Sequence, residues 1–251
     1  MKHKQNLTPV FVCILFFNGC AFQKKAQTPL KTVNFNYAPI KSDSSGAAKI
    51  GIILISPSFD RKGFTYFSQR PFTDFKKSLE GDLEEMITSR GFTFRGPFNG
   101  YDEITYSDKK ATQIVIEVEI NPSLQSLTAK PWIAHRHFHY QPYGQSYNTY
   151  TYSFEGRLSL SGTIKLTFSE VMSHEKINIR NVSINNVEFD VKTEDRYDDK
   201  DYLPVRDPGF YNPLVTAMEE VYGSVLQKTW GFFDPAEITS WIPQIEELRD
   251  R

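Results

Sequence analysis

The order of apolar and polar positions predicts strands along the first two thirds of the chain. Apolar residues dominate 49–56 too continuously for a half-exposed strand and over too short a stretch for a helix, so we expect a buried central strand there. Alternation predicts further strands at 33–37, 114–120 and 157–168, and the segment 92–98 that follows the first helix is also expected to be a strand. A partner stretch at 177–191 changes phase twice, and Gly162 lies on an apolar side, so we expect bulges in this pair.

Helical spacing appears in three other segments. Apolar residues recur every three or four positions from Pro71 to Arg90, and Gly91 follows the last of them. Asn212-Pro213 is expected to open a second amphipathic helix, and Asp234-Pro235 a third, which Pro243 should kink or split. Strands that cluster while helices segregate predict an α+β fold, in which a mixed or antiparallel sheet carries helices on one face.

The N-terminus has the composition of an export signal. Lys2 and Lys4 precede an apolar run at 10–17 that is too short to span a membrane, and Cys20 follows a small residue just after this run. We therefore predict a lipoprotein signal peptide at 1–19, acylation of Cys20, a lipidated tether at 20–32 and one domain at 33–251. An ordinary signal peptide that leaves a free thiol, or a short uncleaved anchor, is the alternative. Ala21 is not the aspartate that retains lipoproteins in the inner membrane, which favours the outer membrane.

Composition narrows the possible partners. The chain has two cysteines, of which Cys13 lies inside the signal, so the mature protein is expected to form no disulfide. After removal of 1–19, 27 basic residues stand against 30 acidic ones, a balance that gives no support to nucleic-acid binding. The expected partners are the membrane, through the acyl chains, and a protein or a glycan.

Aromatic residues concentrate between Trp132 and Phe154, where Gln141-Pro142-Tyr143-Gly144 predicts the turn of a long aromatic β-hairpin. Tyr and Trp combine a flat apolar face with a polar group, so this hairpin is the candidate binding surface. A cross-strand ladder that only stiffens the hairpin, or an aromatic tip that faces a membrane, are the other interpretations. The candidate residues are Trp132, His137, Tyr140, Tyr143 and Tyr147.

Two clusters raise the question of a metal. His135, His137 and His139 would share one face of a strand and could ligate zinc or copper only if the strand bends, which leaves a metal-dependent enzyme as a third hypothesis. The acidic residues at 195–201 lack the glycine and closing glutamate of a calcium loop, so we interpret them as a solvated linker. No phosphate loop, nucleophile elbow or zinc-protease helix is present, and we expect no catalytic residue and no cofactor.

The order of several short motifs resembles the neuraminyllactose-binding haemagglutinin family. These motifs are Ile50–Ile55 with Ser56-Pro57-Ser58-Phe59, Ser89-Arg90-Gly91-Phe92, Tyr106-Ser107-Asp108-Lys109-Lys110, and Phe154-Glu155-Gly156-Arg157-Leu158 continuing through Gly162, Lys165, Thr167, Glu170, Met172 and Ser173 to Glu175. The resemblance covers most of 33–192 and implies a lipid-anchored surface or flagellar-sheath protein of the adhesin type.

One departure limits what this resemblance implies. The basic segment assigned to sialyl-lactose binding in that family would fall at 122–129, where this chain has no Lys or Arg. A site for a carboxylate sugar normally supplies such donors, so sugar binding is not carried over. The expected function is non-enzymatic binding at the outer membrane or cell surface, and the alternative is a periplasm-facing lipoprotein that docks on an envelope or flagellar assembly machine.

Overall fold

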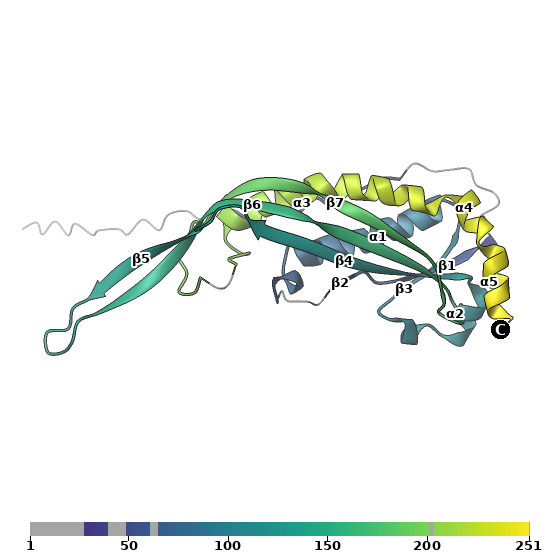
Figure 1. Ribbon diagram of the computed structural model, residues 1–251, viewed down its shortest axis with the longest axis horizontal. Helices are drawn as coiled ribbons and strands as arrows, with labels where there is room; N and C mark the ends of the chain where they lie inside the picture. Colours follow the sequence, from purple (N-terminus) through teal and green to yellow (C-terminus); the bar gives the residue numbers. More distant parts are fainter. Residues whose placement is uncertain (1–27, 40–48, 61–64, 201–202, 251) are drawn as a thin grey trace, which may run out of the picture.

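The protein is built on one mixed, seven-stranded sheet (Figure 1). A computed structural model describes residues 28–39, 49–60, 65–200 and 203–250. The main strand order is β3-β1-β4-β6-β5, β2 pairs with β4, and β7 pairs with β6. The strands are β1 (Gly51–Ile55), β2 (Ser58–Phe59), β3 (Thr93–Phe98), β4 (Ile114–Ser126), β5 (Trp132–His139), β6 (Tyr147–Glu170) and β7 (Lys176–Lys192). Strand β1 runs parallel to β3 and β4, whereas β6 is antiparallel to β4, β5 and β7.

Two long helices cover one face of the sheet, and the α+β class predicted from the sequence is confirmed. They are α1 (Phe72–Ser89) and α3 (Pro208–Trp230), and α4 (Pro235–Ser240) and α5 (Ile242–Arg249) follow at the C-terminal end. The opposite face carries a small apolar cluster around Ile53 and Val115, which the segment with η3 (Tyr101–Glu103) covers before α2 (Tyr106–Ala111). The sequence patterns did not predict α2 or the short 3-10 helix η2 (Thr65–Ser68).

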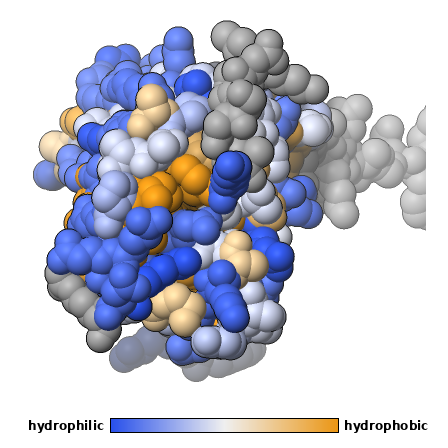
Figure 2. Space-filling view, turned by 90° about the vertical axis from the view of Figure 1, so that its right-hand side faces the viewer, coloured by the Kyte–Doolittle hydropathy of each residue, from blue (hydrophilic) through white to orange (hydrophobic). Residues whose placement is uncertain are grey.

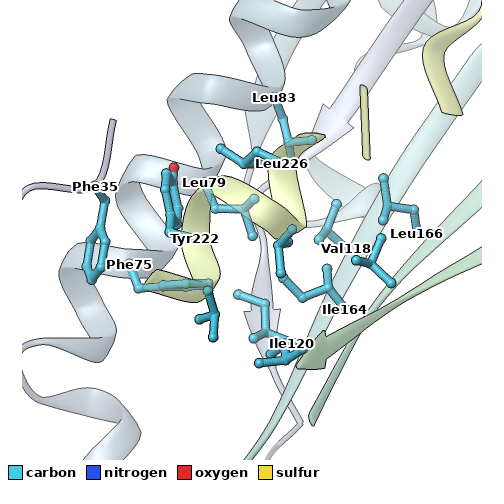
Figure 3. Packing of buried hydrophobic residues seen from close by; sticks show 14 of the residues in the cluster. Phe35, Phe75, Leu79, Leu83, Val118, Ile120, Ile164, Leu166, Tyr222 and Leu226 are labelled. Carbon is cyan, nitrogen blue, oxygen red and sulfur yellow. The ribbon is translucent and has the colours of Figure 1, made fainter. Parts of the chain in front are cut away.

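The main core lies between the helices and the sheet (Figure 3). Leu79 and Leu83 of α1 and Leu226 of α3 point toward the inner residues of β4 and β6. All five residues of β1 are buried, as a central strand with both faces covered requires. Burial of aliphatic and aromatic side chains on this scale is the main favourable contribution to folding.

The strand predicted at 33–37 is absent, because this segment is extended but pairs with no strand. The alternation has another cause: Phe35 is buried against Phe75 and Tyr222, with ring centroids 5.4 and 5.1 Å away, and its two neighbours are exposed. The segment is fastened to α3 instead of to the sheet, since the Asn34 amide donates to Glu219 at 2.8 Å.

Two predictions about breaks in regular structure are confirmed. Gly162 has φ +143°, and the β6·β7 register shifts between Leu160 and Gly162, where β7 has one extra residue. A Cβ on Gly162 would lie 2.2 Å from the carbonyl oxygen of Asn121, so the close approach of β4 requires glycine. The phase change between Ile179 and Val182 involves no bulge, because the register is unbroken there and Ile179 faces outward, 44% exposed. A further register shift in this pair lies between Phe168 and Ser169, near the start of β7. Pro243 lies in the first turn of α5, and the predicted third helix is split at Trp241.

The predicted start of the second long helix is wrong. Helix α3 begins at Pro208, because Asp207 caps it by accepting a hydrogen bond from the Gly209 amide at 2.8 Å, and Pro208 fits the first helical position. Pro213 is therefore an interior residue of α3.

Candidate functional site

A two-stranded arm extends from one end of the body (Figure 1). We define the arm as Trp132–Phe154, which comprises β5, a turn and the first part of β6. The two strands pair in continuous antiparallel register from Trp132–Phe154 at the base to His139–Tyr147 near the end. The Gly144 amide lies 3.4 Å from the Gln141 carbonyl oxygen within the turn. The long aromatic hairpin predicted from the sequence is thus present, and it projects beyond the helices instead of packing under them.

One face of the arm is a ladder of imidazoles and hydroxyls. Each histidine Nε2 atom lies within hydrogen-bonding distance of a hydroxyl on β6, and each uses a different hydroxyl. The pairs are His135 with Ser153 at 2.8 Å, His137 with Thr151 at 2.8 Å and His139 with Thr149 at 2.7 Å. Among the residues that the structure describes, no group of three or more His, Cys, Asp or Glu side chains is placed to hold a metal ion. The histidines therefore serve as cross-strand partners here, which is the arrangement that stiffens a ribbon.

The other face is aromatic and continues the apolar surface of the core. At the base, Phe154 is buried, with its ring 5.2 Å from Trp132 and 6.0 Å from Phe210 of α3. Farther out, Tyr150 and Phe138 follow on the same face but no helix covers them, and they are 48% and 60% exposed. Arg136 lies on this face too, and its Nε donates to Asn148 at 2.9 Å. The arm therefore carries a row of aromatic rings that begins in the core and ends in solvent, with one cationic side chain beside it.

The five candidate residues predicted from the sequence do not form one patch. Trp132 is half-buried at the base on the aromatic face, whereas His137 and Tyr147 lie on the histidine face. Tyr140 and Tyr143 lie at the turn, 73% and 104% exposed. Three of the five therefore gather in the outer part of the arm, which we call the tip and define as Phe138–Tyr147. The sixth predicted site residue, Cys20, lies outside the described residues.

The base of the arm is fixed to the body by Asp207. Tyr197 forms an isolated bridge to Tyr152 of β6, with both backbone hydrogen bonds at 2.7 Å, and its hydroxyl donates to Asp207 at 2.8 Å. Burial and the bond to this carboxylate raise the pKa of Tyr197, so its phenol remains a donor. The amide of Asp195 also donates to Asp207, at 2.9 Å. The start of the acidic stretch interpreted as a linker is thus bound to the cap of α3 through its backbone, and Asp201 lies outside the described residues.

A second candidate site was not visible in the sequence. A cleft of about 810 Å³ lies where the extended N-terminal segment passes α1 and α3. Four cationic side chains line it against one carboxylate, that of Asp74, so the cleft favours an anionic group. The cations are Lys31, Arg70, Lys77 and Arg206. Lys31 is paired with Glu219 and Arg70 with Asp74, whereas the other two form no ion pair within the described part of the chain. These residues are far apart in sequence, and no local motif brings them together.

The fold and the arm define an α+β protein with a projecting aromatic ribbon. No family model matches the sequence, and no curated protein matches it. The structure is similar to that of a neuraminyllactose-binding hemagglutinin homologue from Helicobacter pylori, with a TM-score of 0.51 and 16% identity over 79% of this chain and 92% of that one. At this identity the likeness establishes a common fold alone, which is the fold that the sequence resemblance implied.

Two lipoproteins align at lower TM-scores. One is a lipoprotein from Neisseria meningitidis, with a TM-score of 0.29 and 9% identity over 56% of this chain and 83% of that one. The other is a minor lipoprotein from Acinetobacter baumannii, with a TM-score of 0.31 and 10% identity over 75% of this chain and 93% of that one. No helix in the described part of this chain is long and apolar enough to cross a membrane.

Proposed function

We propose that this protein is a lipid-anchored protein of the outer membrane that acts by binding, with the arm as its contact surface. The observation that carries the proposal is the exposure of aromatic side chains on the arm, such as Phe138 at 60% and Tyr143 at 104%. Large rings that lie outside a well-packed core are typical of interaction surfaces. The body already has a complete core between the helices and the sheet, so the arm is not needed to bury it.

The lipid anchor is supported by the N-terminal sequence. Cys20 directly follows a small residue at the end of a short apolar run, and it is the only cysteine outside that run. Several acyl chains on one residue would hold a protein stably on a bilayer, since each buried methylene contributes about 0.8 kcal/mol. The first described residues, from Thr28 onward, lie along α3, so the body begins within a short distance of this cysteine.

The hemagglutinin homologue with the same fold is named for binding neuraminyllactose, and this activity is not part of the proposal. The segment 122–129, where the basic residues would fall, has none, and 122–126 belongs to β4, paired with β6. A carboxylate sugar would therefore find no cationic donors on this segment. The adhesin type enters the proposal as a mode of action, binding from a lipid-anchored surface position, and the sugar does not.

Two measurements test the proposal. Intact-mass analysis of the native protein should show a chain that begins at an acylated Cys20, and an unmodified residue 20 would contradict the anchor. A photo-crosslinking amino acid placed at Tyr143 in living cells should form specific crosslinks, either to a protein or glycan partner or to lipid. The matched control is Tyr106, a 70% exposed tyrosine on α2 of the body. Equal labelling at both positions, or none at Tyr143, would contradict the assignment of the arm.

The side of the outer membrane is decided by protease treatment of intact cells. Digestion of the body before lysis would support a surface protein of the adhesin type. Protection until lysis would favour the alternative, a periplasm-facing lipoprotein that docks on an envelope or flagellar assembly machine. Either result is compatible with an arm that binds, so the crosslinking experiment remains a separate test.

A further inference from the structure

We propose that the tip of the arm is a second membrane contact, which rests in the headgroup layer of the bilayer that holds the acyl chains of Cys20. This inference rests on the proposed function, because the anchor determines which end of the body faces the membrane. It names the partner of the arm as a lipid surface. Three observations support it: the residue types of the tip, the position of the arm on the body, and the lengths of the tether and the arm.

The chemistry of the outer arm suits a bilayer interface. From His137 to Phe154 the chain contains no Asp, Glu, Lys or Arg, although such residues make up 24% of the whole sequence. The exposed large apolar side chains of the tip are three tyrosines and one phenylalanine, and uncharged polar residues, two of them glutamines, lie between them. Such rings concentrate at membrane interfaces, where the apolar part meets the acyl boundary and the hydroxyl meets water.

The described chain leads toward Cys20 from the same end of the body that carries the arm. The Thr28 amide lies 3.3 Å from a carboxylate oxygen of Glu194. Thr193, the residue before Glu194, accepts a hydrogen bond of 2.9 Å from the amide of Phe154 at the base of the arm. The first described residue and the arm base are thus joined through two adjacent residues at the end of β7. The other end of the body, viewed in Figure 2, is covered mostly by hydrophilic side chains.

The lengths of the tether and the arm allow the acyl chains and the tip to reach the same membrane surface. The eight residues from Cys20 to Thr28 span at most about 26–29 Å. The part of β6 from Tyr147 to Phe154 rises about 23–24 Å, and the turn extends the arm further. A body held by this tether therefore keeps its tip within reach of the membrane surface. Contact at two points would restrict the tilt of the body, which a single flexible tether cannot do.

The backbone limits how deeply the tip can enter. A two-stranded ribbon leaves unpaired N–H and C=O groups along its outer edges, and these groups are costly in hydrocarbon. The opposite face of the arm also carries hydroxyls and imidazoles. The tip therefore sits among the headgroups and does not span the bilayer.

The test uses the full lipidated protein in vesicles of phosphatidylethanolamine and phosphatidylglycerol. Because Cys20 would be acylated and Cys13 removed with the signal, Tyr143→Cys would create the single free thiol for an environment-sensitive fluorophore. We expect blue-shifted emission and quenching by spin labels on the headgroup or the upper acyl chain. Tyr106→Cys, on the body, is the matched control and should remain in water.

A second variant measures the contribution of the rings. Without the anchor, as Cys20→Ala, the chain should partition weakly into the same vesicles. A triple variant should lower that partition coefficient about tenfold or more, because the contact of each ring with lipid is lost. It combines Tyr140→Ser, Tyr143→Ser and Tyr147→Ser. The effect should change little with salt, since the arm carries no Lys or Arg beyond Arg136 to be screened. Circular dichroism of the triple variant checks that the body remains folded.

The outcomes separate the two proposals. An acylated Cys20 with a fluorophore at position 143 that stays water-accessible would overturn the membrane contact and leave the lipid anchor intact. A spectral change that depends on protein concentration but not on vesicles would also overturn it, in favour of a second copy. Specific binding of a protein or glycan by the tip, without vesicle binding, would do the same. An unmodified residue 20 would contradict the proposed function, whatever the vesicles show.

Discussion

Replacement of Asp207 by alanine is expected to destabilise the junction between the arm and the body. Asp207 is 2% exposed, and its carboxylate accepts hydrogen bonds from four donors in two parts of the chain. The donors are the Gly209 amide at 2.8 Å, the Glu194 amide at 3.0 Å, the Asp195 amide at 2.9 Å and the Tyr197 hydroxyl at 2.8 Å. The variant removes all four acceptor interactions and leaves the donors partly buried.

The expected loss in the free energy of unfolding can be worked out from these hydrogen bonds. Loss of the helix cap costs about 1 kcal/mol, and each hydrogen bond to a charged acceptor contributes about 1.5–3 kcal/mol. These contributions do not add fully, because water can enter and the end of β7 can relax, so we expect Asp207→Ala to lower the free energy of unfolding by about 3–5 kcal/mol. Tyr197→Phe removes one donor and keeps the backbone bridge to Tyr152, so its expected cost is about 1 kcal/mol.

Urea denaturation followed by circular dichroism measures both variants, with the slope checked for two-state behaviour. Amide hydrogen exchange at Tyr152, whose N–H donates to Tyr197 at 2.7 Å, reports the arm base directly and should accelerate much more in Asp207→Ala than in Tyr197→Phe. A loss below about 1 kcal/mol for Asp207→Ala, or equal losses for both variants, would refute the reasoning.

Three further predictions concern the body. Burial opposes ionisation of Glu170, but hydrogen bonds from the Ser173 amide and from Arg249 outweigh it and hold the pKa of the carboxyl below its usual 4.5. The ionised Glu170 therefore stabilises the fold above about pH 4.5, and this stabilisation is lost as the pH falls through the lower pKa of the folded state. Urea titrations should show that the free energy of unfolding falls less with acid in Glu170→Gln than in the wild type. Gly162→Ala should cost about 3 kcal/mol in the same assay, since its Cβ would lie 2.2 Å from a β4 carbonyl oxygen, and wild-type stability would contradict the bulge geometry. Phe35→Ala should cost about 3–5 kcal/mol if the N-terminal segment belongs to the core, and a loss below 1 kcal/mol would show that it does not.

The sequence predicted the elements whose pattern reflects a single physical cause. Strand β1 and helix α1 are confirmed because continuous apolar burial and helical spacing leave few alternatives. The segment around Phe35 was misjudged because alternation reports which side chains are buried and not what the backbone pairs with. The start of α3 was predicted wrongly because Asn212-Pro213 has the residue pattern of a helix start. Asp207-Pro208 has the same pattern, and only there is the capping side chain buried and bonded to the helix.

The candidate site was predictable in outline only. The composition of the arm was visible as a run of aromatic residues, but its division into two faces depends on the register of β5 and β6. The separation of Trp132 from Tyr143 depends on where the body ends, which no local pattern reports. The cationic cleft could not be predicted, because tertiary packing brings together 30–35, 68–78 and 205–211.

The body and the arm satisfy different physical requirements. In the body, most of the large apolar residues are explained by the core that they fill, and the exposed ones, such as Tyr106 and Ile179, are scattered singly. In the arm, the ladder of histidines and hydroxyls shows that polar pairs are available to join the two strands. Folding alone therefore does not require Phe138 or Tyr143 to be aromatic, and their exposure costs solubility. The proposed contact outside the chain would account for these rings, and an uncharged tip on the end of the body where we propose the anchor makes the lipid interface the contact that fits them best.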